Sequence, residues 1–188
     1  MPHQSHLHGR LMKNKVLLDK KAVERTINRI AHEIIEKNQG GEALRLIGIR
    51  TRGVHLAQRI KQKIENIEHI SLPLGVLDIT MYRDDVFKLK SPELKKTEIP
   101  FDVNNITIIL IDDVMQTGRT TRAAIDAIMD LGRPKRIQLA VLVDRGDREL
   151  PIHPDYAGAF YAAHPEEDVV VRLNEVDGKD EVVIVVSS

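Results

Sequence analysis

Two adjacent aspartates, Asp112 and Asp113, follow a run of apolar residues in the segment ITIILIDDVMQTGRTT. The apolar run at residues 106–112 predicts a strand buried on both faces of a parallel sheet, and the aspartates would end it. Neighbouring strand side chains point to opposite faces, but at a strand end both carboxylates can turn outward. There they could accept hydrogen bonds from two adjacent sugar hydroxyls, or hold Mg²⁺ through water.

A turn rich in threonine comes after the aspartates, and a helical pattern begins at Arg122. Gly118 lets the backbone bend and approach a ligand closely, while Thr117, Thr120 and Thr121 offer hydroxyl donors. The free amides at the start of the helix would point at the same place, which favours a bound anion. Carboxylates for sugar hydroxyls beside amides for a phosphate predict a receptor for a ribose 5-phosphate.

A plain structural role is the alternative for these residues. Thr120 or Thr121 could simply cap the helix, and Asp112 and Asp113 could be solvated loop residues. Each dipeptide alone favours that interpretation, whereas the complete succession of strand, acidic pair, turn and helix favours ligand binding. The segment is not a Walker loop, because the G-x-x-x-x-G-K pattern is missing.

The elements that would position this segment alternate between strands and helices. Strands are predicted at residues 44–49, 71–82, 106–112, 137–144, 169–173 and 181–186. Helices are predicted at residues 19–39 with Asp19 as N-cap and Gly40 and Gly41 as the stop, at 54–67, and at 121–134. This alternation predicts an α/β fold with a mostly parallel, twisted sheet flanked by helices. Ligands of such sheets bind beyond the carboxyl ends of the strands, where the loops 50–53, 112–121 and 144–148 would lie.

The bulk composition is that of a globular protein. The chain has 188 residues, enough for a sizeable core, and its 28 basic residues balance 28 acidic ones, so nucleic-acid binding would need a local basic face. The absence of cysteine excludes disulfides, thiolate metal sites and a cysteine nucleophile. No apolar run approaches the roughly 20 residues of a membrane span, and no signal segment stands out, which predicts a cytoplasmic protein. Residues 1–11 show no regular period, so we expect a disordered leader or tag before a single domain at 12–188.

The acidic pair followed by TGRTT resembles the phosphoribosyl pyrophosphate (PRPP) motif of the type I phosphoribosyltransferases. The resemblance implies their fold, with a flexible hood loop at about residues 76–104, and Mg²⁺ bound together with PRPP. Asp112 and Asp113 would contact the ribose hydroxyls, take part in catalysis and hold the metal indirectly, and the turn would hold the 5-phosphate. The PRPP and nucleotide contacts so implied are Thr51, Arg52, Gly53, Asp112, Asp113, Met115, Gln116, Thr117, Gly118, Arg119, Thr120 and Thr121.

Further roles follow from the same resemblance. The loop at residues 50–53 would bind the pyrophosphate, since arginine offers planar paired donors to phosphate oxygens. Arg83, in the hood, would be a catalytic residue that closes on the departing pyrophosphate while the hood excludes water. Val143, Asp144 and Arg145 would line the base site. Each role has a structural alternative. The arginines of the loop 50–53 could be ordinary surface residues, and Arg83 could belong to an ordinary charged loop. Asp144 and Arg145 could form a local ion pair.

The segments NRIAHEI, GIRTRGVHLAQRI, LDITMYRDD and LGRPKRIQLAVLVDRGDRELPI are similar to the branch of that family that regulates pyrimidine operons. This branch implies two functions. One is uracil phosphoribosyltransferase activity, in which uracil and PRPP give UMP and diphosphate. The other is binding of the pyrimidine operon mRNA leader in the presence of UMP or UTP, which regulates transcription attenuation. The RNA contacts predicted on this basis are Arg25, Asn28, Arg29, His32 and Arg148.

Several alternatives stay open at this point. The charged helix face that carries Arg25 and His32 is equally compatible with simple solvation. The enzyme could act on another base, such as a purine, or the chain could be a non-catalytic, nucleotide-sensing RNA regulator. The family also implies a homodimer or homotetramer. Asn28 stands where a threonine is common in the family, which weakens the prediction of RNA binding more than that of catalysis.

Overall fold

A computed structural model describes residues 15–84 and 96–186 of the chain. Within these ranges the largest sheet has five parallel strands in the order β3-β2-β4-β5-β6. The strands of this sheet are β2 (Leu44–Ile49), β3 (Leu74–Leu77), β4 (Thr107–Met115), β5 (Arg136–Asp144) and β6 (Tyr156–Phe160). The residues 1–11 expected to form a leader lie outside the described ranges.

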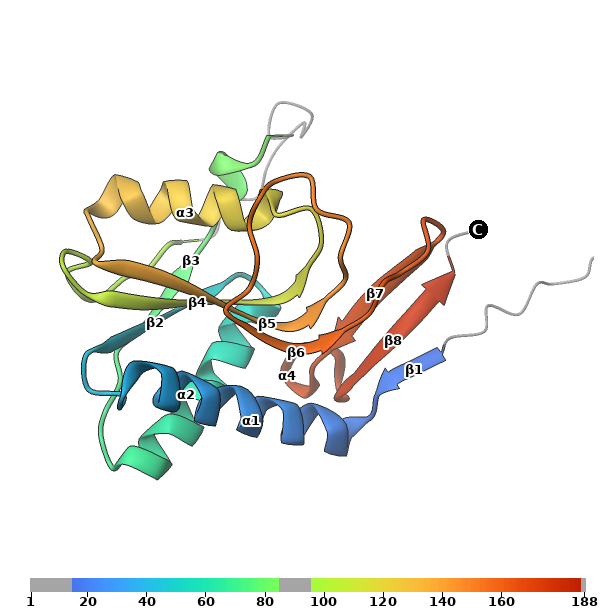
Figure 1. The fold of residues 1–188 in the computed structure, drawn as a ribbon, viewed down its shortest axis with the longest axis horizontal. Helices are drawn as coiled ribbons and strands as arrows, with labels where there is room; N and C mark the ends of the chain where they lie inside the picture. The colour runs from blue at the N-terminus through green and yellow to red at the C-terminus, as the bar shows by residue number, and fades with distance from the viewer. Residues whose placement is uncertain (1–14, 85–95, 187–188) are drawn as a thin grey trace, which may run out of the picture.

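Helices cover both faces of this sheet (Figure 1). Helices α1 (Lys20–Asn38) and α2 (Arg52–Glu68) lie on one face, and α3 (Arg119–Leu131) lies on the other. The alternation of side chains along β4 explains the arrangement, because Ile109 and Ile111 pack with α1 and α2 while Ile108 and Leu110 pack with α3. The predicted α/β fold with a mostly parallel sheet flanked by helices is therefore confirmed.

The two ends of helix α1 lie close to the capping residues predicted from the sequence. Asp19 caps α1, its Oδ1 accepting a hydrogen bond of 2.7 Å from the amide of Ala22. The helix ends at Asn38 because Gln39 adopts a left-handed conformation, with φ of 57°. Gly40, the predicted stop, comes one residue later and also has a positive φ.

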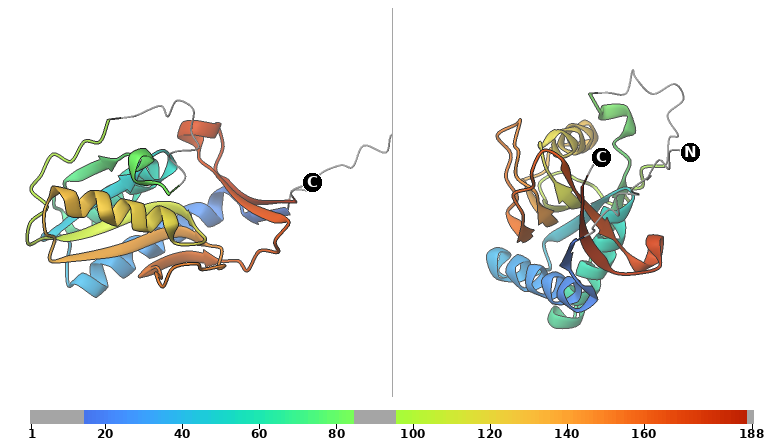
Figure 2. Two further views of the ribbon diagram at one scale, coloured as in Figure 1. Left: turned by 90° about the horizontal axis from the view of Figure 1, so that it is seen from above. Right: turned by 90° about the vertical axis from the view of Figure 1, so that its right-hand side faces the viewer.

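A second, antiparallel sheet lies beyond one end of the main sheet (Figure 2). In the described part of the chain it has three strands in the order β1-β8-β7. These are β1 (Lys15–Leu18), β7 (Glu167–Arg172) and β8 (Glu181–Val186), with the short helix α4 (Asn174–Asp177) between the last two. The sequence predicted the last two strands but not their separation into another sheet.

Two strands, β1 and β6, were not predicted. Strand β1 is only four residues long, and β6 reads YAGAF, whose small residues give no strand signal. Its glycine is required by packing, because a Cβ atom at Gly158 would lie 2.3 Å from the carbonyl oxygen of Leu142 and 2.5 Å from Cγ2 of Thr26. The close approach of α1 and β5 thus explains a sequence that looks like a loop.

Two element boundaries near the acidic pair differ from those predicted. Strand β4 does not end at Asp112 and Asp113 but continues to Met115, because its ladder with β5 extends to the pair Met115 and Asp144. Helix α3 begins at Arg119, ahead of the apolar pattern, after Gly118 at φ of 90°. The aspartates therefore lie within the last paired residues of β4, and the ladder with β5 fixes their backbone.

The predicted hood region of residues 76–104 lies only partly in the described ranges, since residues 85–95 fall outside them. Its first part contains the single-turn helix η1 (Thr80–Tyr82), which contacts α3. Its second part pairs back onto β3 through an antiparallel bridge between Val76 and Glu98. Among the described helices, none has the length and apolar character needed to cross a membrane.

Candidate functional site

The carboxyl ends of the parallel strands β2, β3 and β4 lie at one edge of the main sheet, and the segments that follow them line a cleft. Of the three loops predicted to lie there, 50–53 after β2 and 112–121 around the end of β4 contribute lining residues, whereas 144–148 contributes none to either of the two hollows of this cleft. The segment after β3, which is the first part of the predicted hood, adds a further set that includes Arg83. One hollow of about 420 Å³, within the usual range for ligand sites, is lined by Ile49, Arg50, Thr51, Asp78, Ile79, Thr80, Arg83, Asp112, Asp113, Val114 and Thr120.

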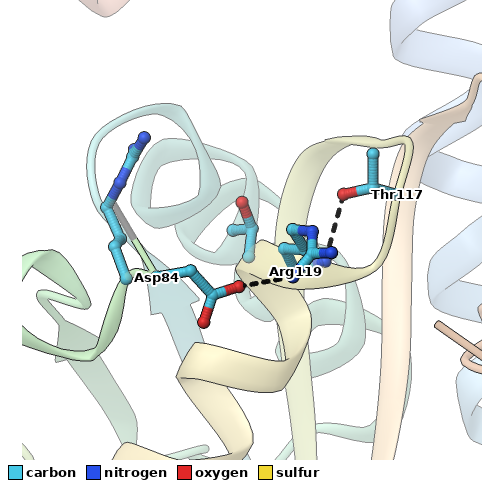
Figure 3. A pocket seen from close by; sticks show the side chains of 5 residues that line it. Asp84, Thr117 and Arg119 are labelled. Atoms are coloured by element: carbon cyan, nitrogen blue, oxygen red, sulfur yellow. Dashed lines mark hydrogen bonds and ion pairs between the residues drawn. The ribbon is translucent and has the colours of Figure 1, made fainter. Parts of the chain in front are cut away.

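A second hollow adjoins the first and shares Arg83 and Thr120 with it. Its other lining residues are Asp84, Thr117 and Arg119 (Figure 3). The acidic pair lines the larger hollow and the threonine turn lines the smaller one, and the shared residues Arg83 and Thr120 join the two hollows into one groove. The sequence predicts that such a groove binds a sugar phosphate.

Asp112 and Asp113 both line the larger hollow although they are neighbours on a strand. Asp112 is only 8% exposed, and its Oδ1 accepts a hydrogen bond of 2.9 Å from the amide of Asp113. The Oδ1 atom of Asp113 in turn accepts one of 2.9 Å from the amide of Val114. Burial, followed by the nearby charge of Asp113, raises the pKa of Asp112 well above its ordinary value. A buried carboxylate of this kind is stabilised by hydroxyl donors or by a cation.

The described residues hold no cluster of three or more His, Cys, Asp or Glu side chains that could bind a metal ion on their own. The two carboxylates could nevertheless serve a hard cation such as Mg²⁺, which keeps several water or ligand oxygens in its shell. The donor set fits a metal that arrives with its substrate rather than one held by the protein alone.

The threonine turn forms a tight cap on α3. The Oγ1 atom of Thr117 accepts a hydrogen bond of 3.2 Å from the amide of Arg119, and the carbonyl of Thr117 accepts bonds of 3.0 Å from the amides of Glu149 and Leu150. The side chain of Thr120 faces both hollows. The turn thus presents a helix start and threonine hydroxyls to the groove.

Other residues of this predicted set have packing roles. Met115 and Thr121 are each 3% exposed, and Met115 belongs to the core under α3. The carbonyl of Gln116 accepts a hydrogen bond of 2.7 Å from Arg148. Arg119 is ion-paired with Asp84 and Glu149, and Figure 3 shows its side chain beside Asp84 at the mouth of the smaller hollow. We expect Met115, Gln116 and Thr121 to support the turn, whereas Arg119 also lines the smaller hollow.

The loop 50–53 divides its residues between the cleft and the rest of the fold. Arg50 lines the cleft and donates from Nη2 to the carbonyl of Lys96 at 2.9 Å, and Thr51 lies beside it. Arg52 points away and forms a paired contact with Asp177 of α4. Gly53 permits a close approach of two backbone segments of the protein itself. A Cβ atom there would lie 2.6 Å from the carbonyl oxygen of Ile111.

Residues that the sequence did not single out also line the cleft, chiefly Asp78 and Thr80. The Oδ1 atom of Asp78 accepts hydrogen bonds from both the amide and the hydroxyl of Thr80, which fixes the carboxylate at the end of β3. Their position just after a parallel strand was the available signal, because that edge of the sheet collects functional loops.

The residues predicted to bind the base do not turn their side chains to the cleft. Val143 is fully buried, and Arg145 is buried with its Nη2 donating to the carbonyl of Glu167. Asp144 pairs with Arg148 at 2.7 Å rather than with Arg145. Any base contact from this loop would therefore come from backbone groups.

Four of the residues predicted to bind RNA share a region of α1, whereas the fifth lies elsewhere. Arg25 and His32 are exposed on that helix, and Nδ1 of His32 lies 2.7 Å from the carbonyl of Asn28. Arg29 pairs with Glu33 and also donates to carbonyls of β6. Arg148 is mostly buried behind the threonine turn and donates to the carbonyls of residues 116, 146 and 152.

Comparison with protein families matches residues 13–176 to the phosphoribosyl transferase domain. The chain is 54% identical over 174 residues to the bifunctional protein PyrR of Halalkalibacterium halodurans, covering 91% of this chain and 97% of that one. It is 52% identical over 173 residues to the bifunctional protein PyrR of Macrococcus caseolyticus, covering 92% and 99%.

Among solved structures, the chain is similar to a hypoxanthine-guanine phosphoribosyltransferase of Bacillus anthracis, with a TM-score of 0.69 and 16% identity over 93% of this chain and 98% of that one. It is also similar to a hypoxanthine phosphoribosyltransferase of Staphylococcus aureus, with a TM-score of 0.67 and 16% identity over 98% of both chains. At this identity the likeness shows a shared fold and carries no information on the base.

Proposed function

Because the chain belongs to the phosphoribosyltransferase family and, within it, to the PyrR proteins, we propose that it has two linked functions. It is a uracil phosphoribosyltransferase that converts uracil and PRPP into UMP and diphosphate. It also binds the pyrimidine operon mRNA leader when UMP or UTP is present, and so regulates transcription attenuation.

One observation carries the enzymatic part. The acidic pair near the end of β4 and the threonine turn at the start of α3 line the groove formed by the two adjoining hollows. Carboxylates accept hydrogen bonds from the two ribose hydroxyls, and the amides of a helix start favour the 5-phosphate. Arg50, Thr51 and Arg83 also line the larger hollow, and the pyrophosphate of PRPP would extend towards them.

Catalysis then depends on position and charge. The bond between C1 of the ribose and the pyrophosphate oxygen breaks with its electrons going to pyrophosphate, and N1 of uracil forms the new bond from the opposite side. Arg50 and Arg83 stabilise the departing anion, while Asp112 and Asp113 hold the ribose as positive charge develops on it. Asp113, which is less buried, is our candidate acceptor for the proton that N1 loses.

Phosphoribosyltransferases generally use Mg²⁺ with PRPP, and the ion, when bound, neutralises pyrophosphate charge. Asp112 and Asp113 would hold it through water. The remaining residues of the site have supporting roles in this proposal. Gly53 and Met115 fix the backbone by packing, Arg52 anchors the loop before α2, and the loop 143–145 offers backbone groups to the base.

The regulatory part rests on α1, where Arg25, Asn28 and His32 form a polar face with Arg29. Arginine and histidine side chains suit phosphate and base contacts with a structured RNA. We also propose that the protein is cytoplasmic and assembles as a homodimer or homotetramer, so that two such helices present a larger surface. We further propose that a single domain extends over residues 12–188.

Base specificity is tested by incubating the protein with PRPP, Mg²⁺ and either labelled uracil or labelled hypoxanthine. We expect UMP and no IMP, and the reverse result would establish a purine enzyme. The non-catalytic alternative predicts a third outcome, namely UMP-dependent binding of a pyrimidine leader hairpin with no turnover of any base. A mobility-shift assay with and without UMP separates that outcome from an enzyme without RNA affinity.

A further inference from the structure

The carboxylate of Asp84 lies in the smaller hollow beside the threonine turn (Figure 3). Its Oδ2 atom accepts a hydrogen bond of 2.8 Å from Nη1 of Arg119, and its Oδ1 atom accepts one of 2.5 Å from Nη2 of Arg122. Both arginines belong to the first turn of α3. A protein carboxylate therefore pairs with two positive side chains at the start of the helix where a phosphate would bind.

The segment that carries Asp84 is docked along α3 by further polar contacts. The carbonyl of Tyr82 accepts a hydrogen bond of 3.2 Å from Nη2 of Arg122, and the hydroxyl of Tyr82 donates one of 2.7 Å to Oδ2 of Asp130. The contacts of Asp84 are thus part of an ordered arrangement. They are also exposed, with 42% of the Asp84 side chain and 51% of the Arg119 side chain open to solvent, so they can be exchanged at small cost.

On the basis of the proposed function, which locates the 5-phosphate at residues 117–121, we infer that Asp84 is a specificity-determining residue that competes with the ligand phosphate for Arg119 and Arg122. A phosphate in the turn and the carboxylate of Asp84 would occupy the same small hollow with like charges. Binding of a phosphorylated ligand therefore requires Asp84 to withdraw from at least one arginine. An unphosphorylated nucleoside makes no such demand.

The inference is tested by measuring the affinities of the full-length protein for UMP, uridine and inorganic phosphate by calorimetry at fixed ionic strength. Asp84→Asn removes the competing charge, and we expect about three- to tenfold tighter binding of UMP, a similar gain for phosphate and no change for uridine. Asp84→Ala should behave in the same way. Raising the salt concentration should reduce the difference between variant and wild type.

Asp126→Asn is the matched control. Asp126 also pairs with Arg122, at 2.8 Å and with a similar exposure, but it does not line either hollow. We expect this variant to bind all three ligands like the wild type. If it tightened UMP binding as much as Asp84→Asn, the effect would reflect a general loss of negative charge and the inference would be wrong.

Failure of the inference differs from failure of the proposed function. A wild-type protein that prefers UMP to uridine, with an unchanged or smaller preference in Asp84→Asn, overturns the role of Asp84 alone. A wild-type protein that binds UMP no better than uridine overturns the phosphate site as well, and both proposals with it.

Discussion

Arg52 and Asp177 connect the two sheets of the molecule through a paired contact. Nη2 of Arg52 donates to Oδ1 of Asp177 at 2.8 Å, and Nε donates to Oδ2 at 3.1 Å. The same Oδ2 atom accepts a hydrogen bond of 2.9 Å from the amide of Leu173. The loop that precedes α2 at the cleft is thereby fixed to α4 and to the antiparallel sheet.

We predict that Asp177→Asn lowers the free energy of unfolding by about 1 kcal/mol at pH 7 and raises the KM for PRPP several-fold. The hydrogen bond from Arg52 lowers the pKa of Asp177 below its ordinary value of 3.8. This contribution is present above pH 3.8 and is lost as the pH falls through the lower folded-state pKa. Urea unfolding at pH 7 and near pH 3 should therefore show the gap between wild type and variant closing in acid.

Glu181→Gln provides the control for that experiment. Glu181 is also an ion-paired carboxylate of the antiparallel sheet with a lowered pKa, but its partners are Arg172 and Lys179. Its loss should reduce stability without changing the KM for PRPP. Equal effects of both variants on the KM would show that the contact of Arg52 with Asp177 has no particular role at the cleft.

The pKa of Asp112 predicts an opposite dependence on pH. Burial, with the charge of Asp113, raises the folded-state pKa of Asp112 above its ordinary value of 3.8, so the folded protein binds a proton more readily than the unfolded chain. Stability from this group is therefore lost as the pH rises from 3.8 towards the folded-state pKa. Asp112→Asn should be more stable than the wild type at neutral pH, and the advantage should shrink on acidification.

The same substitution should reduce UMP synthesis by about a hundredfold, because the ribose loses a negative partner while positive charge develops on it. Unfolding curves without ligand and initial rates with PRPP and uracil measure the two effects separately. Asp126→Asn, on the exposed side of α3, should change neither quantity appreciably. If Asp112→Asn were less stable than the wild type at neutral pH, burial of the Asp112 carboxylate would not destabilise the folded protein, and the prediction would be wrong.

Gly53, in the first turn of α2, leads to a third prediction. A Cβ atom at Gly53 would lie 2.6 Å from the carbonyl oxygen of Ile111 and 3.3 Å from the Cα atom of Asp112, and both obstacles are backbone. Gly53→Ala should therefore cost about 1–3 kcal/mol of stability and displace the acidic pair, which lowers turnover. Gly41→Ala is a useful comparison, because its nearest obstacle, Cδ1 of Ile70 at 2.7 Å, belongs to a flexible side chain. We expect a smaller loss of stability there and no loss of activity, and thermal unfolding with initial rates would show the difference.

The sequence predicted elements with strong periodicity and failed where tertiary contacts decide. Strand β2 was predicted with both of its bounds, because an apolar run between turn residues is unambiguous. Strand β6 was missed because Gly158 is required by its close contacts with Leu142 and Thr26, and glycine has no local preference for a strand. The extension of β4 to Met115 comes from its ladder with β5, which single-strand patterns do not contain.

The site shows the same division. Motif residues such as Asp113 and Thr117 were found because their types and spacing suit a ligand directly. Side-chain directions were not predictable, since they depend on distant partners. Arg52 turns to Asp177, and Arg148 turns to Asp144 instead of to solvent. Arginines that suit phosphate or RNA by type alone are thus used to hold the loops together.

The α1 face gives a last prediction, in which exposed and structural residues should differ. Arg25→Ala and His32→Ala should weaken binding of a pyrimidine leader hairpin in the presence of UMP and leave UMP synthesis intact. If Arg25 contacts a phosphate, its loss should also reduce the slope of log K against log salt by about one. Arg29→Ala should in addition lower the melting temperature, because Arg29 donates to the carbonyls of Ala157 and Gly158. Lys61→Ala, on α2 and paired with Glu65, should leave RNA affinity unchanged. Unaltered RNA affinity in both Arg25→Ala and His32→Ala would mean that this face of α1 is a solvated surface and that the RNA binds elsewhere.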